Sequence, residues 1–204
     1  WDWEQVPGRI ADGPRSADAC GWWTGRAESD LSAAAAMGHN AHRMGLASAS
    51  FDTVCISNSL HHLDPEPVLR EMKRVLRPGG HLLVSEMYRD NLTETQMTHV
   101  HLHHWWAAVD TVNGIVHNET YTRQELLDLV AALELTDLST FDLSDLTENP
   151  RDPAIMEELT PVFERYIQRA EGHPDLQTRG AELRQRVEEV GFHSATALVV
   201  MGRK

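Results

Sequence analysis

The feature that most constrains the fold is a strand–helix–strand pattern over residues 51–86. The run 51–57 is short and apolar, which is typical of a buried strand, and its cysteine is expected to be a buried thiol. Asp64-Pro65 predicts a helix start, with Asp as the N-cap and Pro in the first turn. Pro78-Gly79-Gly80 ends that helix, with Gly80 supplying a positive φ, and residues 81–86 form the next strand. A strand, a crossover helix and a second strand predict a parallel pair.

Two capping boxes predict the helices that follow. Thr93 with Gln96 begins a helix that ends at Asn113-Gly114, and Thr122 with Glu125 begins a second one. Strands are expected at 135–143 and at 195–201, with the latter at the end of the chain.

Between these two strands, Asp152-Pro153 and Thr160-Pro161 each have the composition of a helix start. Pro161 is therefore expected to break or kink this segment, because proline lacks the backbone donor that a helix interior needs. A last helix is expected to end at Gly191. By contrast, residues 1–37 have neither helical nor strand periodicity, and we expect an irregular or poorly ordered segment there.

The order of these motifs resembles class I S-adenosylmethionine-dependent methyltransferases of the small-molecule, type 11-like kind. The resemblance lies in Phe51-Asp52-Thr53-Val54, Ser59-Leu60-His61-His62-Leu63, Leu69-Arg70-Glu71 and Arg74-Val75-Leu76-Arg77-Pro78-Gly79-Gly80. It implies an α/β fold with a Rossmann-like, mostly parallel sheet, an antiparallel last strand and helical insertions. Residues 38–204 would then be the C-terminal part of such a domain, with a helical cap at about 92–114 and an insertion at about 152–190.

The resemblance also implies S-adenosyl-L-methionine as cofactor. Asn40-Ala41 resembles the pair that contacts the adenine, and the loop of Ser57, Asn58, Ser59 and Leu60 would line the methionine end. The family's glycine-rich loop is not recognisable, since the glycines of the run 20–26 are wrongly spaced and no apolar strand precedes them. The N-terminal strands are thus expected to be incomplete, and a chain without them is expected to bind cofactor weakly.

Three side chains are candidates for catalysis. His61 and His62 follow the strand 51–57 at the sheet edge where ligands bind in such folds, and an imidazole can serve as general base near neutral pH. Either could instead pack against the helix that begins at Pro65. Glu86, at the end of the next strand, is a second candidate for base or for orienting the acceptor, or is simply a carboxylate near a helix N-terminus.

The run 99–106, His-Val-His-Leu-His-His-Trp-Trp, is the most unusual local feature. We favour a cap whose aromatic residues line an acceptor pocket, and we name as substrate-binding candidates Tyr88, His101, His104 and Trp105. His99 and His103 share a helical face at a spacing that can bind a metal, but no carboxylate stands at an obvious spacing as a third ligand, so we assign no metal ligands. Plain packing, or a homodimer contact, is the remaining interpretation.

A formal net charge of −13 disfavours a nucleic-acid partner, because such a chain repels phosphate. No apolar run is long enough for a membrane span and no leader pattern is present, so a cytoplasmic protein without membrane contact is expected. The predicted function is methyl transfer to a small-molecule acceptor. A non-catalytic or truncated methyltransferase-like protein, or a His-rich metal-binding helical module, remain as alternatives.

Overall fold

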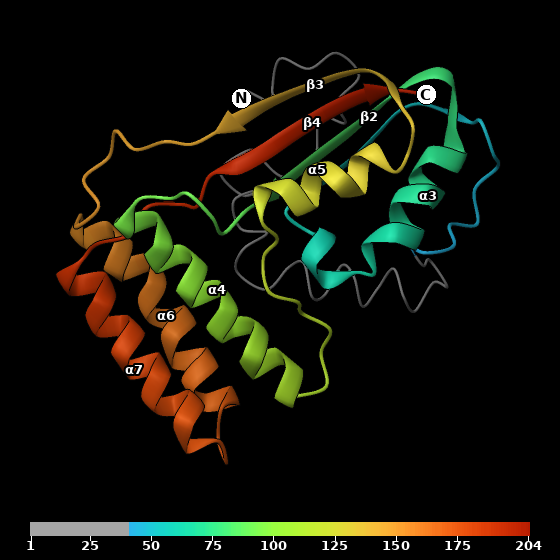
Figure 1. Ribbon diagram of the computed structural model, residues 1–204. Helices are drawn as coiled ribbons and strands as arrows, with labels where there is room; N and C mark the ends of the chain where they lie inside the picture. The colour runs from blue at the N-terminus through green and yellow to red at the C-terminus, as the bar shows by residue number, and fades with distance from the viewer. Residues whose placement is uncertain (1–40) are drawn as a thin grey trace, which may run out of the picture. The chain divides into compact units, whose positions relative to one another are not determined.

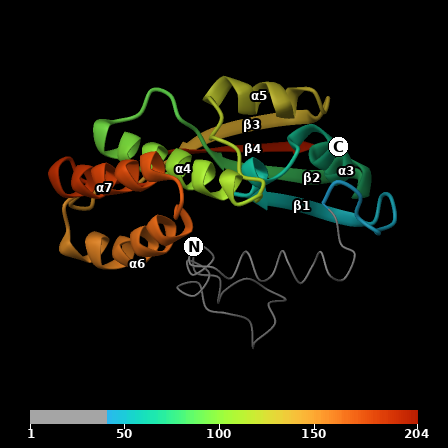
Figure 2. The ribbon, with the colours of Figure 1, turned by 90° about the horizontal axis from the view of Figure 1, so that it is seen from below.

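A four-stranded sheet organises the part of the chain that the computed structural model describes, residues 41–204. Its strands are β1 (Phe51–Ser57), β2 (Leu76–Met87), β3 (Thr136–Leu143) and β4 (Ala197–Arg203), in the order β1-β2-β4-β3 (Figure 2). β1 runs parallel to β2, whereas β4 is antiparallel to both β2 and β3. All elements described below belong to the unit Leu46–Lys204.

Two helices pack on one face of the sheet. α3 (Pro65–Val75) is the crossover from β1 to β2, and α5 (Arg123–Ala131) precedes β3 (Figure 1). The apolar face of α3 is buried, as its helical periodicity requires: Val68, Leu69, Met72 and Val75. A short 3-10 turn, η3 (Leu60–His62), links β1 to α3 and holds the two histidines just beyond the end of β1.

Three helices form a second layer beside the sheet. α4 (Glu94–Val112), α6 (Pro153–Arg169) and α7 (Pro174–Glu189) lie side by side in Figures 1 and 2. Their shared core contains Leu102, Trp105, Val109, Phe163, Tyr166, Leu183 and Val187. α4 and α7 approach closely because position 180 is glycine: a Cβ there would lie 2.3 Å from a ring carbon of Trp105.

The predicted fold class is confirmed. The sheet has three strands in one direction and an antiparallel last strand, with helices around it, as expected for a Rossmann-like methyltransferase fold. Both capping boxes form, and most predicted strands and helices lie close to their expected bounds. β2 is the exception, because it begins at Leu76 and includes Pro78-Gly79-Gly80, which was expected to separate the helix from the strand.

Three local predictions are wrong. β1 is largely exposed rather than buried, and Cys55 is exposed, because β1 pairs only with β2 among the described residues. The predicted break at Pro161 is absent, because α6 continues from Pro153 to Arg169 and packs there against α4 and α7, whereas a kink at this position stays a prediction. Gly79, not Gly80, has the positive φ, whereas Gly80 has no room for a side chain beside the Asp52 carbonyl.

The expectation for residues 1–37 and the adenine contact at Asn40 lie outside the described residues. Ala41 is described, but nothing tests its predicted contact with the adenine. No helix among residues 41–204 is long and apolar enough to cross a membrane.

Candidate active site at the carboxyl ends of β1 and β2

Asn58 lies where β1 ends and the chain turns away from the sheet. Its backbone N–H donates to the Ser85 carbonyl at 2.8 Å, and its φ of 43° is in the left-handed region that asparagine tolerates. Its side-chain oxygen, Oδ1, is buried and has no hydrogen-bond partner among residues 41–204. A buried acceptor without a donor is costly, so this atom fits a polar ligand at the edge of the sheet.

Glu86, at the end of β2, fixes the turn that follows β1. Its carboxylate is 1% exposed and accepts hydrogen bonds from the Leu60 backbone N–H at 2.8 Å and from His61 Nδ1 at 3.0 Å. Two of the predicted catalytic residues, His61 and Glu86, thus lie in contact at the ends of neighbouring parallel strands. Because the carboxylate bonds to Nδ1 of His61, Nε2 is the nitrogen of this ring left for another group.

His62 is half-buried beside His61 and holds a defined tautomer. Its Nδ1 lies 3.3 Å from the Val116 carbonyl, which can only accept, so Nδ1 carries the proton and Nε2 carries the lone pair of the neutral ring. Burial, with His61 and His117 nearby, lowers the pKa of His62 to about 4. The side chain is therefore a neutral proton acceptor near pH 7.

His117 and Asp110 join the site although neither was among the predicted site residues. His117 Nδ1 lies 2.7 Å from Asp110 Oδ2, and Asp110 is held in turn by Arg169 at 2.8 Å and by the Tyr166 hydroxyl at 3.2 Å. The loop that carries His117 is anchored to η3, because the backbone N–H of Asn118 donates to the His61 carbonyl at 2.8 Å. In the sequence, the contact between His117 and Asp110 could be suspected only from their separation of seven residues.

His103 completes a cluster with His61 and His117. Its Nε2 lies 3.1 Å from His117 Nε2, and its ring centroid lies 4.5 Å from that of His61. Burial, followed by the neighbouring histidines, lowers the pKa of His103 well below its ordinary value. The three buried rings thus lie against one another.

The four predicted acceptor residues have different surroundings. Trp105 is fully buried in the helical core, where its Nε1 donates to the Leu176 carbonyl at 2.8 Å, so its assignment to an acceptor pocket is not retained. Tyr88 is also buried, and His104 Nε2 accepts from the Thr120 backbone N–H at 3.3 Å. Burial, followed by the charges of Arg186 and Arg179 on α7, lowers the pKa of His101.

Two residues of the predicted cofactor loop already have hydrogen-bond partners. Ser59 Oγ donates to the Ser57 carbonyl at 2.8 Å. Leu60 is 1% exposed, and its N–H is bound to Glu86, so it positions the turn rather than offering a free donor. Asn58 is the loop residue whose buried side-chain oxygen has no hydrogen-bond partner in the described part of the chain.

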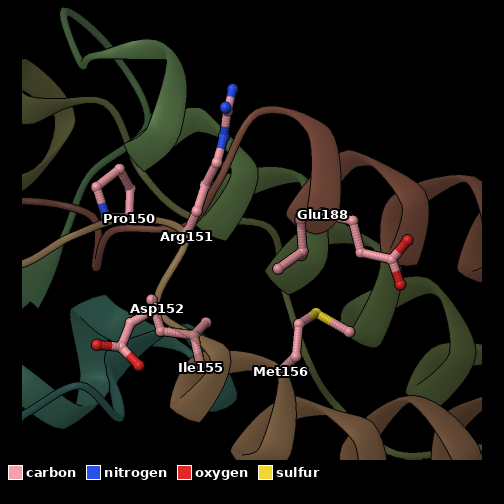
Figure 3. Close-up of a pocket in the computed structure, with 7 residues that line it drawn as sticks. Pro150, Arg151, Asp152, Ile155, Met156 and Glu188 are labelled. Atoms are coloured by element: carbon pink, nitrogen blue, oxygen red, sulfur yellow. The ribbon is translucent and has the colours of Figure 1, made fainter.

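A separate small pocket lies at the start of α6 beside α7 (Figure 3). It is lined by Pro150, Arg151, Asp152, Ile155, Met156, Val187 and Glu188. Asp152 is occupied as the N-cap of α6, where its Oδ1 accepts from the Ala154 N–H at 2.9 Å. The lining contains no histidine or nucleophile, so the chemistry-bearing residues are those at the sheet edge.

Comparison with known proteins finds methyltransferases. Residues 23–84 match the family model described as "Methyltransferase domain". The methyltransferase GfsG of Streptomyces halstedii is 29% identical over 129 residues, covering 61% of this chain and 41% of that protein. The chain thus spans less than half the length of this relative.

Solved structures with a similar fold include the cyclase SpnF and the phosphoethanolamine N-methyltransferase 2 of Haemonchus contortus. For SpnF the TM-score is 0.49 at 20% identity, covering 81% of this chain and 53% of the other. For the Haemonchus enzyme the TM-score is 0.43 at 12% identity, and the match covers 81% of this chain and 36% of that enzyme.

Proposed function

We propose that the chain is part of a class I S-adenosylmethionine-dependent methyltransferase, and that the complete protein transfers a methyl group to a hydroxyl of a small-molecule acceptor. The observation that carries the choice of acceptor is the tautomer of His62. Its Nδ1 donates to the Val116 carbonyl, which leaves Nε2 as a proton acceptor beside the sheet edge. A hydroxyl is a poor nucleophile until its proton is removed, so a neutral imidazole suits this acceptor.

The loop after β1 fits the methionine end of the cofactor. The unpartnered, buried Oδ1 of Asn58 would accept a hydrogen bond from the ammonium group, and Ser57 lies beside it. When bound, S-adenosylmethionine supplies an electrophilic methyl group on a sulfonium. The residues of this chain then need only hold the acceptor in line and take its proton.

Glu86 and His61 act on His62 through the backbone. Glu86 binds the Leu60 N–H and the His61 ring at once, and Asn118 binds the His61 carbonyl, so both sides of η3 are fixed. Both side chains are almost fully buried, at 1% and 3% exposed. We therefore assign them to positioning the base rather than to proton transfer.

The test is methyl transfer from labelled S-adenosylmethionine by the full-length protein to a panel of hydroxylated small molecules. His62→Gln is expected to lower kcat by about 10²–10⁴-fold, because general-base catalysis contributes about that factor. The affinity for the cofactor is expected to stay the same, since His62 is not assigned to bind it.

The matched control is His81→Gln, which changes an exposed histidine on β2. It is expected to leave turnover unchanged. Turnover of His62→Gln equal to that of the unmodified protein would remove His62 from the mechanism. Methyl transfer to nitrogen or carbon acceptors alone would contradict the hydroxyl acceptor while leaving the family in place. A homodimer and a cytoplasmic location remain predictions from the sequence.

A further inference from the structure

We infer that His61, His103 and His117 bind a divalent transition-metal ion. One ligand nitrogen from each of the three rings lies within 4.8 Å of the other two, and all three residues are buried. They come from η3, from α4 and from the loop after α4, so the fold rather than a local sequence repeat brings them together. This inference does not depend on the proposed methyl transfer.

The geometry of the rings is close to that of three imidazoles on one ion. The ring centroids lie 4.5 Å (His61–His103), 4.6 Å (His103–His117) and 5.4 Å (His61–His117) apart. With metal–nitrogen bonds of about 2.0–2.1 Å, tetrahedral coordination would place imidazole centroids about 5 Å apart. The observed separations bracket that value, so the three rings are spaced for a shared ion.

Two buried carboxylates orient the rings as they do in metal sites. Glu86 bonds to Nδ1 of His61 at 3.0 Å, and Asp110 bonds to Nδ1 of His117 at 2.7 Å. Each contact leaves Nε2 with a lone pair and raises its basicity, which is the arrangement of carboxylate–histidine–metal triads. The two negative charges also favour a dication at the cluster.

His103 supplies the independent sign that a ligand is needed. Its Nδ1 is buried without a hydrogen-bond partner among residues 41–204, while its Nε2 lies 3.1 Å from His117 Nε2. A neutral ring has one proton, and if Nε2 donates it to His117, the Nδ1 lone pair is unused. A cation can take up that lone pair directly, or the one at Nε2 after the proton moves to Nδ1.

The metal that suits this donor set is Zn²⁺ or a neighbour such as Co²⁺. Neutral imidazoles suit borderline metals, and three protein ligands with an open fourth position are typical of catalytic rather than structural zinc sites. The i, i+4 pair that the sequence suggested is not used, because His99 Nδ1 accepts from the Ala195 backbone N–H at 2.9 Å. His103 turns instead toward His61 and His117.

The experiment is titration of the chelator-treated protein with Zn²⁺ by calorimetry and with Co²⁺ by absorption spectroscopy. We expect about one ion per chain and a Co²⁺ spectrum of a four-coordinate site. His117→Gln and His103→Gln are each expected to weaken binding by at least about 100-fold. His81→Gln, which changes an exposed histidine, is expected to bind as the unmodified protein does.

Two results would overturn the inference: no saturable binding to the unmodified protein, or the same affinity in His117→Gln. If the cluster variants fail to fold, X-ray absorption at the zinc edge of the unmodified protein decides. Three imidazole nitrogens are expected there, and fewer than two would exclude the site. Each of these experiments measures metal binding and not methyl transfer. Absence of metal binding would therefore leave the proposed methyl transfer unaffected.

Discussion

At the scale of single residues, the histidines differ in the hydrogen-bond partner of their Nδ1 atom. Glu86 accepts a hydrogen bond from Nδ1–H of His61, and the Val116 carbonyl accepts one from Nδ1–H of His62, so both rings present Nε2. At His99 the role is reversed, because the Ala195 backbone N–H donates to Nδ1. The same side chain thus serves as a positioned ring, a proton acceptor or a structural acceptor.

His99 is expected to make stability depend on pH. Burial lowers its pKa to about 4 in the folded protein, against an ordinary value of 6.5. The neutral form is required in the fold, so the contribution is fully present above pH 6.5 and is lost as the pH falls toward 4. Between pH 7.5 and pH 5, this residue should cost about 2 kcal/mol of unfolding free energy.

Urea unfolding at both pH values, with chelator present, measures this effect. His99→Asn keeps an oxygen that can accept from the Ala195 N–H but does not titrate in this range. The variant is expected to be less stable at pH 7.5, since ring packing is lost. When the pH is lowered to 5, its free energy of unfolding should fall by about 2 kcal/mol less than that of the unmodified protein. Equal losses in the two proteins would show that His99 is not held neutral.

At the scale of elements, the contact between α4 and α7 depends on one glycine. Gly180→Ala would place a methyl group 2.3 Å from Cζ2 of Trp105, which is itself fully buried. Alanine gains helix propensity of about 1 kcal/mol, but overpacking is expected to dominate and to destabilise the protein by about 1–3 kcal/mol net. Chemical denaturation measures the change.

Two comparisons separate this clash from other effects of the substitution. Glu182→Ala, at an exposed position of α7, is expected to change stability by less than about 0.5 kcal/mol. Combining Gly180→Ala with Trp105→Phe removes part of the clashing ring, so the two effects should be less than additive. Strict additivity would show that the helices do not meet at this point.

Helix starts and strands could be predicted from the sequence because their signals are local. Thr93 with Gln96 and Thr122 with Glu125 form the expected capping boxes in α4 and α5. Pro161 was misjudged because the packing of α6 against two other helices outweighs one missing backbone hydrogen bond. Trp105 was misjudged because helical periodicity places a residue on a face but does not say what covers that face.

At the scale of the whole described unit, the sheet order decides where chemistry occurs. β1 and β2 are parallel neighbours, so Asn58 and Glu86 meet at the same edge, as the strand–helix–strand pattern predicts. His117 and Asp110 could not be placed from sequence, because their contact depends on the loop after α4 folding back onto η3. That return is fixed by long-range hydrogen bonds such as that from Asn118 to the His61 carbonyl.

The measurement that tests the account most directly is calorimetric titration of the full-length protein with S-adenosylmethionine, compared with Asn58→Gly. Glycine accepts the positive φ of this position, so the substitution removes the side-chain oxygen without adding backbone strain. Loss of one hydrogen bond to a charged group should weaken binding by about 10–100-fold. Equal affinities in the two proteins would contradict a cofactor site at the carboxyl end of β1.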